Sequence, residues 1–137
     1  MIHHCPSLGL VSRKAPLLSN LSVLENIALI NQYHHGFSRQ KAEETAREYL
    51  RRLDLESLAG KRNPQLLEEQ RFGVLVLRAA MIEDSLLVLD RPFQMMPALG
   101  DSGFIYNVIA SVTDRFRECH ILDYSLNAGR YAGRIET

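Results

Sequence analysis

The sequence is short of the residues that mark several classes of protein. Its 137 residues include two cysteines and no tryptophan, and 16 Lys and Arg balance 16 Asp and Glu, for a formal net charge of zero. A balanced charge gives no long-range attraction to nucleic acid or to an anionic membrane surface. Uninterrupted apolar runs such as Leu86 to Leu89 reach only four residues, far below the length of a bilayer span.

Composition and cysteine usage predict one ordinary globular domain. Apolar residues make up 46% and charged residues 23% of the chain, and no internal repeat or flexible linker interrupts it, so we expect a single domain over residues 1–137. Residues 1–6 lack the basic and apolar regions of a signal peptide. Cys5 and Cys119 form no CxxC pair, which favours reduced thiols and a cytoplasmic protein.

The apolar pattern changes between short dense runs and helical spacing several times, which is typical of an α/β fold. The pattern predicts strands over 7–12, 86–89 and 119–123, and helices over 23–33, from Ser38 to about Leu53, over 65–82, from Ser102 toward Phe116 and over 125–132. Residues 54–64 are expected to form a polar connection.

Several helix starts carry a local signal. Ser22 and Glu25 have the spacing of a capping box, and Ser38 and Ser102 are expected to cap the helices that follow them. The helix predicted over 65–82 is polar at first and then nearly all apolar, which indicates a helix that ends in the core. Arg51 and Arg52 lie in a segment of mixed charge, which predicts a solvated face.

Asp90 directly follows the dense apolar run 86–89. Acids at the carboxyl end of a central parallel strand lie where open α/β sheets bind ligands. Asp90 is therefore either a metal ligand or an acid that caps the loop after the strand. Arg13 and Arg91 are expected near the same edge, where they either bind an anion or form ion pairs with Asp90 or Asp123.

Five stretches of the chain follow one another in an order that a known family shares. They are Asn20–Asn26, Asn63–Gln70, Leu77–Ala79, Leu86–Phe93 and the tail from Ala128 to Ile135. Together they resemble the nucleotide-binding domain of an ABC transporter ATPase from its Q-loop to just past its H-loop. The signature motif, usually Leu-Ser-Gly-Gly-Gln, corresponds to Leu66, Leu67, Glu68, Glu69 and Gln70.

The resemblance implies a partial P-loop NTPase fold with about three parallel strands and a helical subdomain over about 21–83. Residues 86–93 correspond to the Walker B segment, and their Asp-x-Pro-Phe form resembles the lipid-transport branch of the family. ATP hydrolysis in this family needs a Gly-rich phosphate cradle upstream of the Q-loop, and the sequence given contains no G-x-x-x-x-G-K-[ST] segment.

The positions that correspond to catalytic residues are altered. The Q-loop Gln falls at Arg13, the catalytic Glu at Arg91, the D-loop Asp at Pro97 and the H-loop His at Asp123. An arginine cannot accept a proton at neutral pH, so Arg91 cannot be the general base. The resemblance therefore implies a catalytically silent protein, with no cofactor and no bound metal expected.

The signature region carries two acids where the family has glycines. Glu68 and Glu69 would repel a triphosphate. They form either an acidic contact surface or the solvated first turn of a helix. His120, three residues before Asp123, is expected on the wrong side of its strand to replace the H-loop His.

These features predict a protein partner. In the family, the Q-loop and the helices after it contact the membrane subunits, so residues 10–63 predict a non-catalytic or regulatory partner of an ABC transport system, peripheral to the inner membrane through that partner. An open sheet edge along Cys119–Asp123 predicts pairing with another chain, a second copy included. The alternative is a fragment of an ATP-binding subunit that uses ATP and Mg²⁺ only with its missing N-terminal part.

Overall fold

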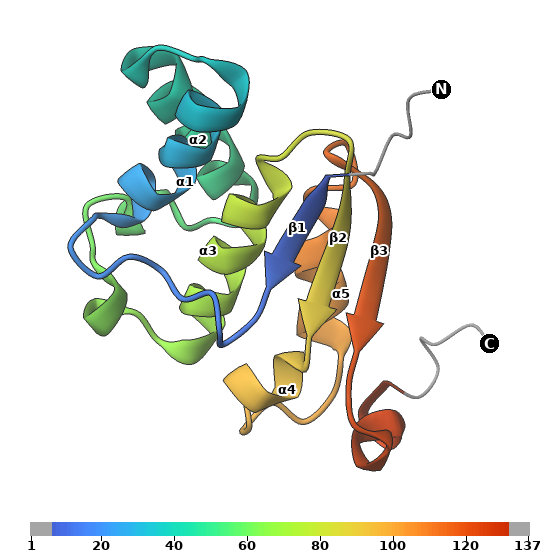
Figure 1. Cartoon of the computed structure of the whole chain (residues 1–137). Coiled ribbons are helices and arrows are strands. Elements are labelled where there is room, and N and C mark those ends of the chain that lie inside the picture. Colours follow the sequence, from blue (N-terminus) through green and yellow to red (C-terminus); the bar gives the residue numbers. More distant parts are fainter. Residues whose placement is uncertain (1–6, 132–137) are drawn as a thin grey trace, which may run out of the picture.

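A three-stranded parallel sheet forms the centre of the molecule. The computed structural model describes residues 7–131. Strand β1 (Leu8–Val11) and strand β3 (Phe116–Leu122) flank the central strand β2 (Ser85–Asp90), in the order β1-β2-β3 (Figure 1). This arrangement confirms the expected α/β class with three parallel strands.

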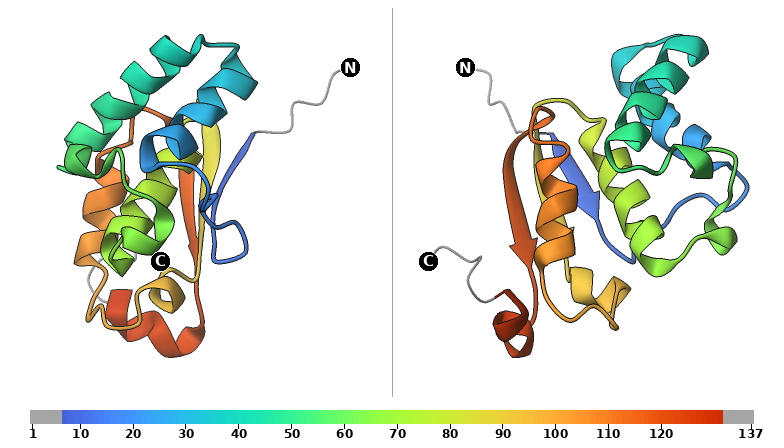
Figure 2. Two further views of the ribbon diagram at one scale, coloured as in Figure 1. Left: turned by 90° about the vertical axis from the view of Figure 1, so that its left-hand side faces the viewer. Right: turned by 180° about the vertical axis from the view of Figure 1, so that it is seen from behind.

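Helices connect the strands in chain order. Between β1 and β2 lie α1 (Val23–His35), α2 (Arg39–Arg52) and α3 (Glu68–Ala80), with short 3₁₀ turns at Glu56–Leu58 and Asn63–Gln65. Between β2 and β3 lie α4 (Pro92–Met95) and α5 (Gly103–Ala110), and the 3₁₀ segment η3 (Ser125–Tyr131) follows β3. Helices α3 and α5 cover one face of the sheet, and α1 and α2 form a pair beside α3 (Figure 2).

The core lies between the sheet and helices α3 and α5, and it continues between α3 and the pair formed by α1 and α2. Side chains of β2 alternate in burial, so that Leu87 and Leu89 have no exposed surface while Leu86 and Val88 are half-buried. In β1, Gly9 allows the strand to approach α3 closely, because a Cβ at this position would lie 2.7 Å from the carbonyl oxygen of Ala79.

The predicted starts of the first two helices are confirmed. Ser22 Oγ accepts a hydrogen bond from the Glu25 amide at 3.1 Å, and Glu25 Oε1 accepts one from the Ser22 amide at 2.9 Å. Ser38 Oγ accepts from the amide of Lys41 at 3.2 Å. Helix α1 ends at Gly36, whose φ of 64° is the left-handed conformation that favours glycine.

Two predicted boundaries and one predicted cap are wrong. The third helix begins at Glu68 instead of residue 65, because Asn63–Gln65 forms a separate 3₁₀ turn and Leu66 has an extended backbone. The helix after Ser102 ends at Ala110. The Ser102 hydroxyl makes no capping hydrogen bond, since Ser102 has φ −84° and ψ 1° instead of the extended conformation in which a cap residue reaches the helix amides.

The last two elements also differ from the prediction. Phe116, expected on the inner face of a helix, is the first residue of β3, since the chain turns between Val112 and Arg115. The expected terminal helix is the 3₁₀ segment η3, and its end at Ala132, like the family-like tail beyond it, lies outside the described residues.

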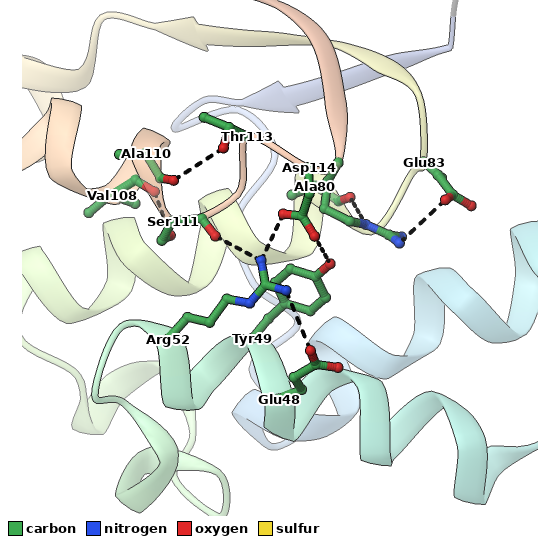
Figure 3. Close-up of polar contacts among 11 residues, drawn as sticks. Glu48, Tyr49, Arg52, Ala80, Glu83, Val108, Ala110, Ser111, Thr113 and Asp114 are labelled. Carbon is green, nitrogen blue, oxygen red and sulfur yellow. Dashed lines mark hydrogen bonds and ion pairs between the residues drawn. The ribbon is translucent and has the colours of Figure 1, made fainter.

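A polar cluster anchors α2 to the loop between α5 and β3 (Figure 3). Arg52 Nη1 donates to Asp114 Oδ1 at 2.7 Å, and the Tyr49 hydroxyl donates to the other oxygen of Asp114 at 2.8 Å. Arg115 donates from Nε to the carbonyl of Ala80 at 3.1 Å. Arg51 and Arg52 are exposed, as the solvated face predicted, and the guanidinium of Arg52 also binds a residue 62 positions away.

As expected, β3 is an edge strand in the part of the chain that the structure describes, since β2 is its one strand partner there. Strand β1 forms the opposite edge. Segment η3 lies beyond the carboxyl end of β3 instead of alongside it (Figure 1). Within residues 7–131, no other strand pairs with the outer edge of β3, so this edge is free to pair with another strand.

Candidate functional site

The carboxyl ends of β1 and β2 bring Ser12 and Asp90 together. Ser12 is buried and follows β1, and its hydroxyl donates to Asp90 Oδ2 at 3.3 Å. Because parallel neighbouring strands end at the same edge of a sheet, residues 78 positions apart become neighbours. This edge is the place where the sequence predicted a ligand-binding acid.

Arg91 engages the carboxylate of Asp90 with two nitrogens. Its Nε donates to Oδ1 at 3.0 Å and its Nη2 to Oδ2 at 3.1 Å, while Nη1 donates to the hydroxyl of Tyr124 at 2.9 Å. The hydrogen bonds from Arg91 hold the pKa of Asp90 below its usual value. Of the two alternatives for Arg91, the structure therefore has the ion pair with Asp90.

The backbone of Arg91 is unusual as well. Its φ of 51° and ψ of 60° lie in the left-handed region, which residues other than glycine adopt at a cost in energy. The amide of Arg91 donates to the carbonyl of Leu122, at the end of β3. Arg91 is thus held through both its backbone and its side chain at the carboxyl edge of the sheet.

A cleft of about 410 Å³ lies beside this edge. It is lined by Arg13, Glu68 and Pro97, the positions that correspond to the Q-loop, the signature and the D-loop, and also by Ser12 and Gln94. The structure therefore brings together three positions that the sequence analysis singled out. Arg91 is not among the lining residues; its guanidinium is bound to Asp90 and to the hydroxyl of Tyr124.

The signature-like residues surround the start of α3. Leu66 is buried and Leu67 is 70% exposed, and the amide of Leu67 donates to Gln70 Oε1 at 2.9 Å. Glu68 and Glu69 are exposed in the first turn of α3, where the helix dipole favours negative charge. Glu68 lines the cleft described above, whereas Glu69 faces a smaller one beside Gly73 on α3.

Asp123, at the H-loop position, organises the segment after β3. Its Oδ1 accepts from Asn127 Nδ2 at 2.8 Å, and its Oδ2 accepts from the hydroxyl of Tyr131 at 2.7 Å. Burial, followed by the bond to Asp123, raises the pKa of Tyr131. His120 is exposed and lies 3.1 Å from a carboxylate oxygen of Glu118.

Arg78 is a residue at this edge that sequence reasoning missed. Its Nη1 donates to the carbonyl of Pro16 at 2.8 Å and its Nη2 to the carbonyl of Ala15, so that α3 holds the loop after β1. Burial lowers the pKa of Arg78. A lone arginine within an otherwise apolar helical run was the available signal, because a charge in such a place needs a specific partner.

Between residues 7 and 131, no group of three or more His, Cys, Asp and Glu side chains is placed to hold a metal ion. The chemistry that the described edge offers is an arginine-paired carboxylate next to a cleft lined by two arginines, Arg13 and Arg71, and one acid, Glu68.

Comparison with known proteins connects the fold to a family. No family model matches the chain. A sulfate/thiosulfate import ATP-binding protein CysA of Mesorhizobium japonicum is 38% identical over 95 residues, which are 67% of this chain and 28% of that protein. A molybdenum import ATP-binding protein ModC of Hahella chejuensis is 34% identical over 89 residues, 65% of this chain and 24% of that protein. The chain thus spans about a quarter of the length of these relatives.

Solved structures agree on the fold. A dimeric structure of a bacterial ABC transporter cassette superposes with a TM-score of 0.64 at 22% identity, covering 92% of this chain and 56% of that one. A dimeric post-hydrolysis structure of an ATP-binding cassette bound to ADP and Pi gives the same TM-score at 21% identity.

The fold is therefore the α/β fold of P-loop NTPases, in a partial form. The chain is a relative of the ATP-binding proteins of ABC transporters and corresponds to part of their ATPase domain. These relatives are named for sulfate and molybdenum import, so the resemblance to the lipid-transport branch has no support from them. None of the helices in residues 7–131 is long and apolar enough to cross a membrane.

Proposed function

We propose that the chain is a catalytically silent, ABC ATPase-like protein that acts as a non-catalytic or regulatory partner of an ABC transport system. The observation that carries this proposal is the ion pair between Arg91 and Asp90. Asp90 stands at the Walker B position, and both of its carboxylate oxygens accept from Arg91. A guanidinium cannot accept a proton, so the neighbouring position supplies no general base.

Two further positions support the same proposal. Glu68 and Glu69 place two negative charges at the start of α3, where the family binds the phosphates of a partner's nucleotide with small residues. The carboxylate of Asp123, at the H-loop position, accepts hydrogen bonds from Asn127 and Tyr131 and so stabilises the segment after β3. No cofactor is part of the proposed function.

The proposed role needs a protein partner. Helices α1 and α2, together with the loop after β1, form the part that corresponds to the family's contact with membrane subunits. The open edge of β3 offers a second place for pairing with another chain. We place the protein in the cytoplasm, peripheral to the inner membrane through its partner.

The test is to measure phosphate release from Mg-ATP by the purified chain and by the Arg91→Glu variant. Both are expected to stay at the level of a protein-free blank, because restoring one carboxylate does not supply a phosphate cradle. Arg91→Gln is the matched control, since it removes the charge without adding a base. Phosphate release from Arg91→Glu well above that from Arg91→Gln would contradict the proposal.

A second candidate is a fragment of an ATP-binding subunit that binds and hydrolyses ATP with Mg²⁺ only when joined to its phosphate-binding part. The small share of each relative that the chain spans, 28% of the CysA protein, favours this candidate. Intact mass spectrometry of the endogenous protein separates the two. A species near 15.6 kDa recovered with a transporter subunit supports the first, and a larger species with an upstream Gly-rich loop supports the second.

A further inference from the structure

The cleft of about 410 Å³ at the carboxyl edge of the sheet has an apolar floor. The end of β1, the start of α3 and helix α4 meet around this cleft (Figure 1). Phe72 and Leu75 of α3 are buried, and Met95 of α4 is half-buried. A volume of this size lies within the range of clefts that hold small molecules, and such a floor favours a ligand with an apolar body.

Two side chains of opposite charge line the same cleft. Arg13 follows β1, and Glu68 is the first residue of α3. Both side chains are exposed, and neither forms a hydrogen bond or an ion pair with another residue between 7 and 131. A guanidinium binds a carboxylate, and a carboxylate binds an ammonium group. Both charges are therefore available to a ligand that carries the complementary pair.

Arg71 adds a second positive charge in a fixed position. Its Nε donates to Asn63 Oδ1 at 2.6 Å, and its Nη2 donates to the carbonyls of Asn63 at 3.0 Å and Leu66 at 2.9 Å. These bonds hold the guanidinium in the wall of the cleft, so that binding does not have to order it. The arginines repel a ligand that is only cationic, whereas Glu68 repels one that is only anionic.

We propose that this cleft binds a small zwitterion with an apolar side chain, the chemistry that apolar amino acids and short apolar peptides share. The ligand carboxylate accepts from the guanidinium of Arg13, and its ammonium group donates to Glu68. The apolar side chain lies on Phe72 and Leu75. This inference goes beyond the proposed function and does not depend on it, because ligand binding and catalytic silence are separate properties.

The experiment titrates the intact chain, without nucleotide, with L-leucine and with the dipeptide leucyl-leucine. Concentrations up to about 10 mM reach ligands of millimolar affinity, and heat or NMR shifts report binding. The tighter of the two probes shows whether the ligand is a free amino acid or a peptide. Its N-acetyl form lacks the ammonium group and its amide form lacks the carboxylate, so each should bind about tenfold more weakly.

Two variants assign each charge of the ligand to one side chain. Glu68→Gln should remove the preference for the probe over its N-acetyl form and keep the preference over its amide form. Arg13→Gln should do the reverse. Glu69→Gln is the matched control, because Glu69 is the next exposed acid of α3 and faces the other cleft. It should leave all the affinities unchanged.

Three results would overturn the inference. They are no binding of either probe by the parent chain, N-acetyl and amide forms that bind as well as the probe itself, and a loss in Glu69→Gln as large as that in Glu68→Gln. Inorganic phosphate or ATP that binds more tightly than both probes would assign the cleft to an anion instead. Phosphate release plays no part in these titrations, so this inference and the proposed function fail or succeed separately.

Discussion

Neighbouring residues of β2 lie in two different environments. Leu87 and Leu89 point toward the helices and have no exposed surface. Leu86 and Val88 are half-buried on the opposite face of the sheet, which no described helix covers and which we call the bare face. The same strand therefore has one side with the packing of a protein core and another side that is apolar without described partners. Stability of the isolated chain should depend mainly on the first side.

The largest expected effect is on the packed side. Leu87→Ala should lower the free energy of unfolding by about 2–5 kcal/mol, because it leaves a cavity in the centre of the sheet. Leu86→Ala, one position earlier in the same strand, should cost about 1 kcal/mol or less, because its side chain is only half-buried. Urea unfolding of both variants measures the difference, and equal losses would show that the two faces are equally packed.

Gly9→Ala should give the next largest effect. The new Cβ would lie 2.7 Å from the backbone oxygen of Ala79, so β1 must move away from α3 at a cost of about 1–3 kcal/mol. Gly60→Ala is the matched control, since a Cβ there meets no atom within 4 Å. Thermal or urea unfolding checks the pair, and an unchanged midpoint for Gly9→Ala would contradict the close approach.

Asp114→Asn tests whether the anchor of α2 contributes to the packed side. We expect a loss of about 1 kcal/mol, because the half-exposed carboxylate accepts from both Arg52 and Tyr49. The bond from Arg52 lowers the pKa of Asp114 from 3.8, so its contribution is present above that pH and is lost as the pH falls through the lowered pKa.

The measurement for this variant is the difference in unfolding free energy from the parent chain between pH 7 and pH 3. The difference should shrink toward the acid end of the range. Glu44→Gln is the control, because its side chain is exposed and can still accept from Gln40. A difference that does not vary with pH would argue that Asp114 acts through packing and not through its charge.

The smallest expected effect is on the bare face. Val88→Thr should change the free energy of unfolding of the isolated chain by no more than about 0.5 kcal/mol, since a half-buried site tolerates a hydroxyl of the same shape. It should also reduce the binding of a hydrophobic dye. A loss as large as that of Leu87→Ala would show that Val88 is packed in the isolated chain, and the contrast between the two faces would fail.

The elements that the sequence predicted well are those with local signals. The Ser22–Glu25 capping box and the Ser38 cap involve residues three positions apart, so their spacing already contains the geometry. The alternating burial of β2 follows from a dense apolar run. Phe116 was misplaced because the helical spacing of α5 continues by coincidence past Ala110, where the chain turns.

The candidate site was predicted as a set of positions, without its contacts. The resemblance placed Arg13, Glu68 and Pro97 at positions of the family's conserved motifs, and all three residues line the same cleft. Both carboxylate oxygens of Asp90 accept hydrogen bonds from Arg91, and the carboxylate of Asp123 accepts from Asn127 and Tyr131. These contacts depend on the backbone conformation at the strand ends. A sequence motif gives residue types and their order. It does not give the backbone φ of 51° at which the Arg91 side chain contacts Asp90.

By itself the sequence determined the α/β class, the starts of the first two helices and the substitutions at positions that correspond to ABC ATPase motifs. Each of these depends on residues close together in the chain. Only the tertiary structure decided that Ser12 meets Asp90 across 78 positions, that Arg52 meets Asp114, and that one face of the sheet is bare. Contacts of this kind depend on how distant segments pack and on the handedness of their connections, which no local pattern contains.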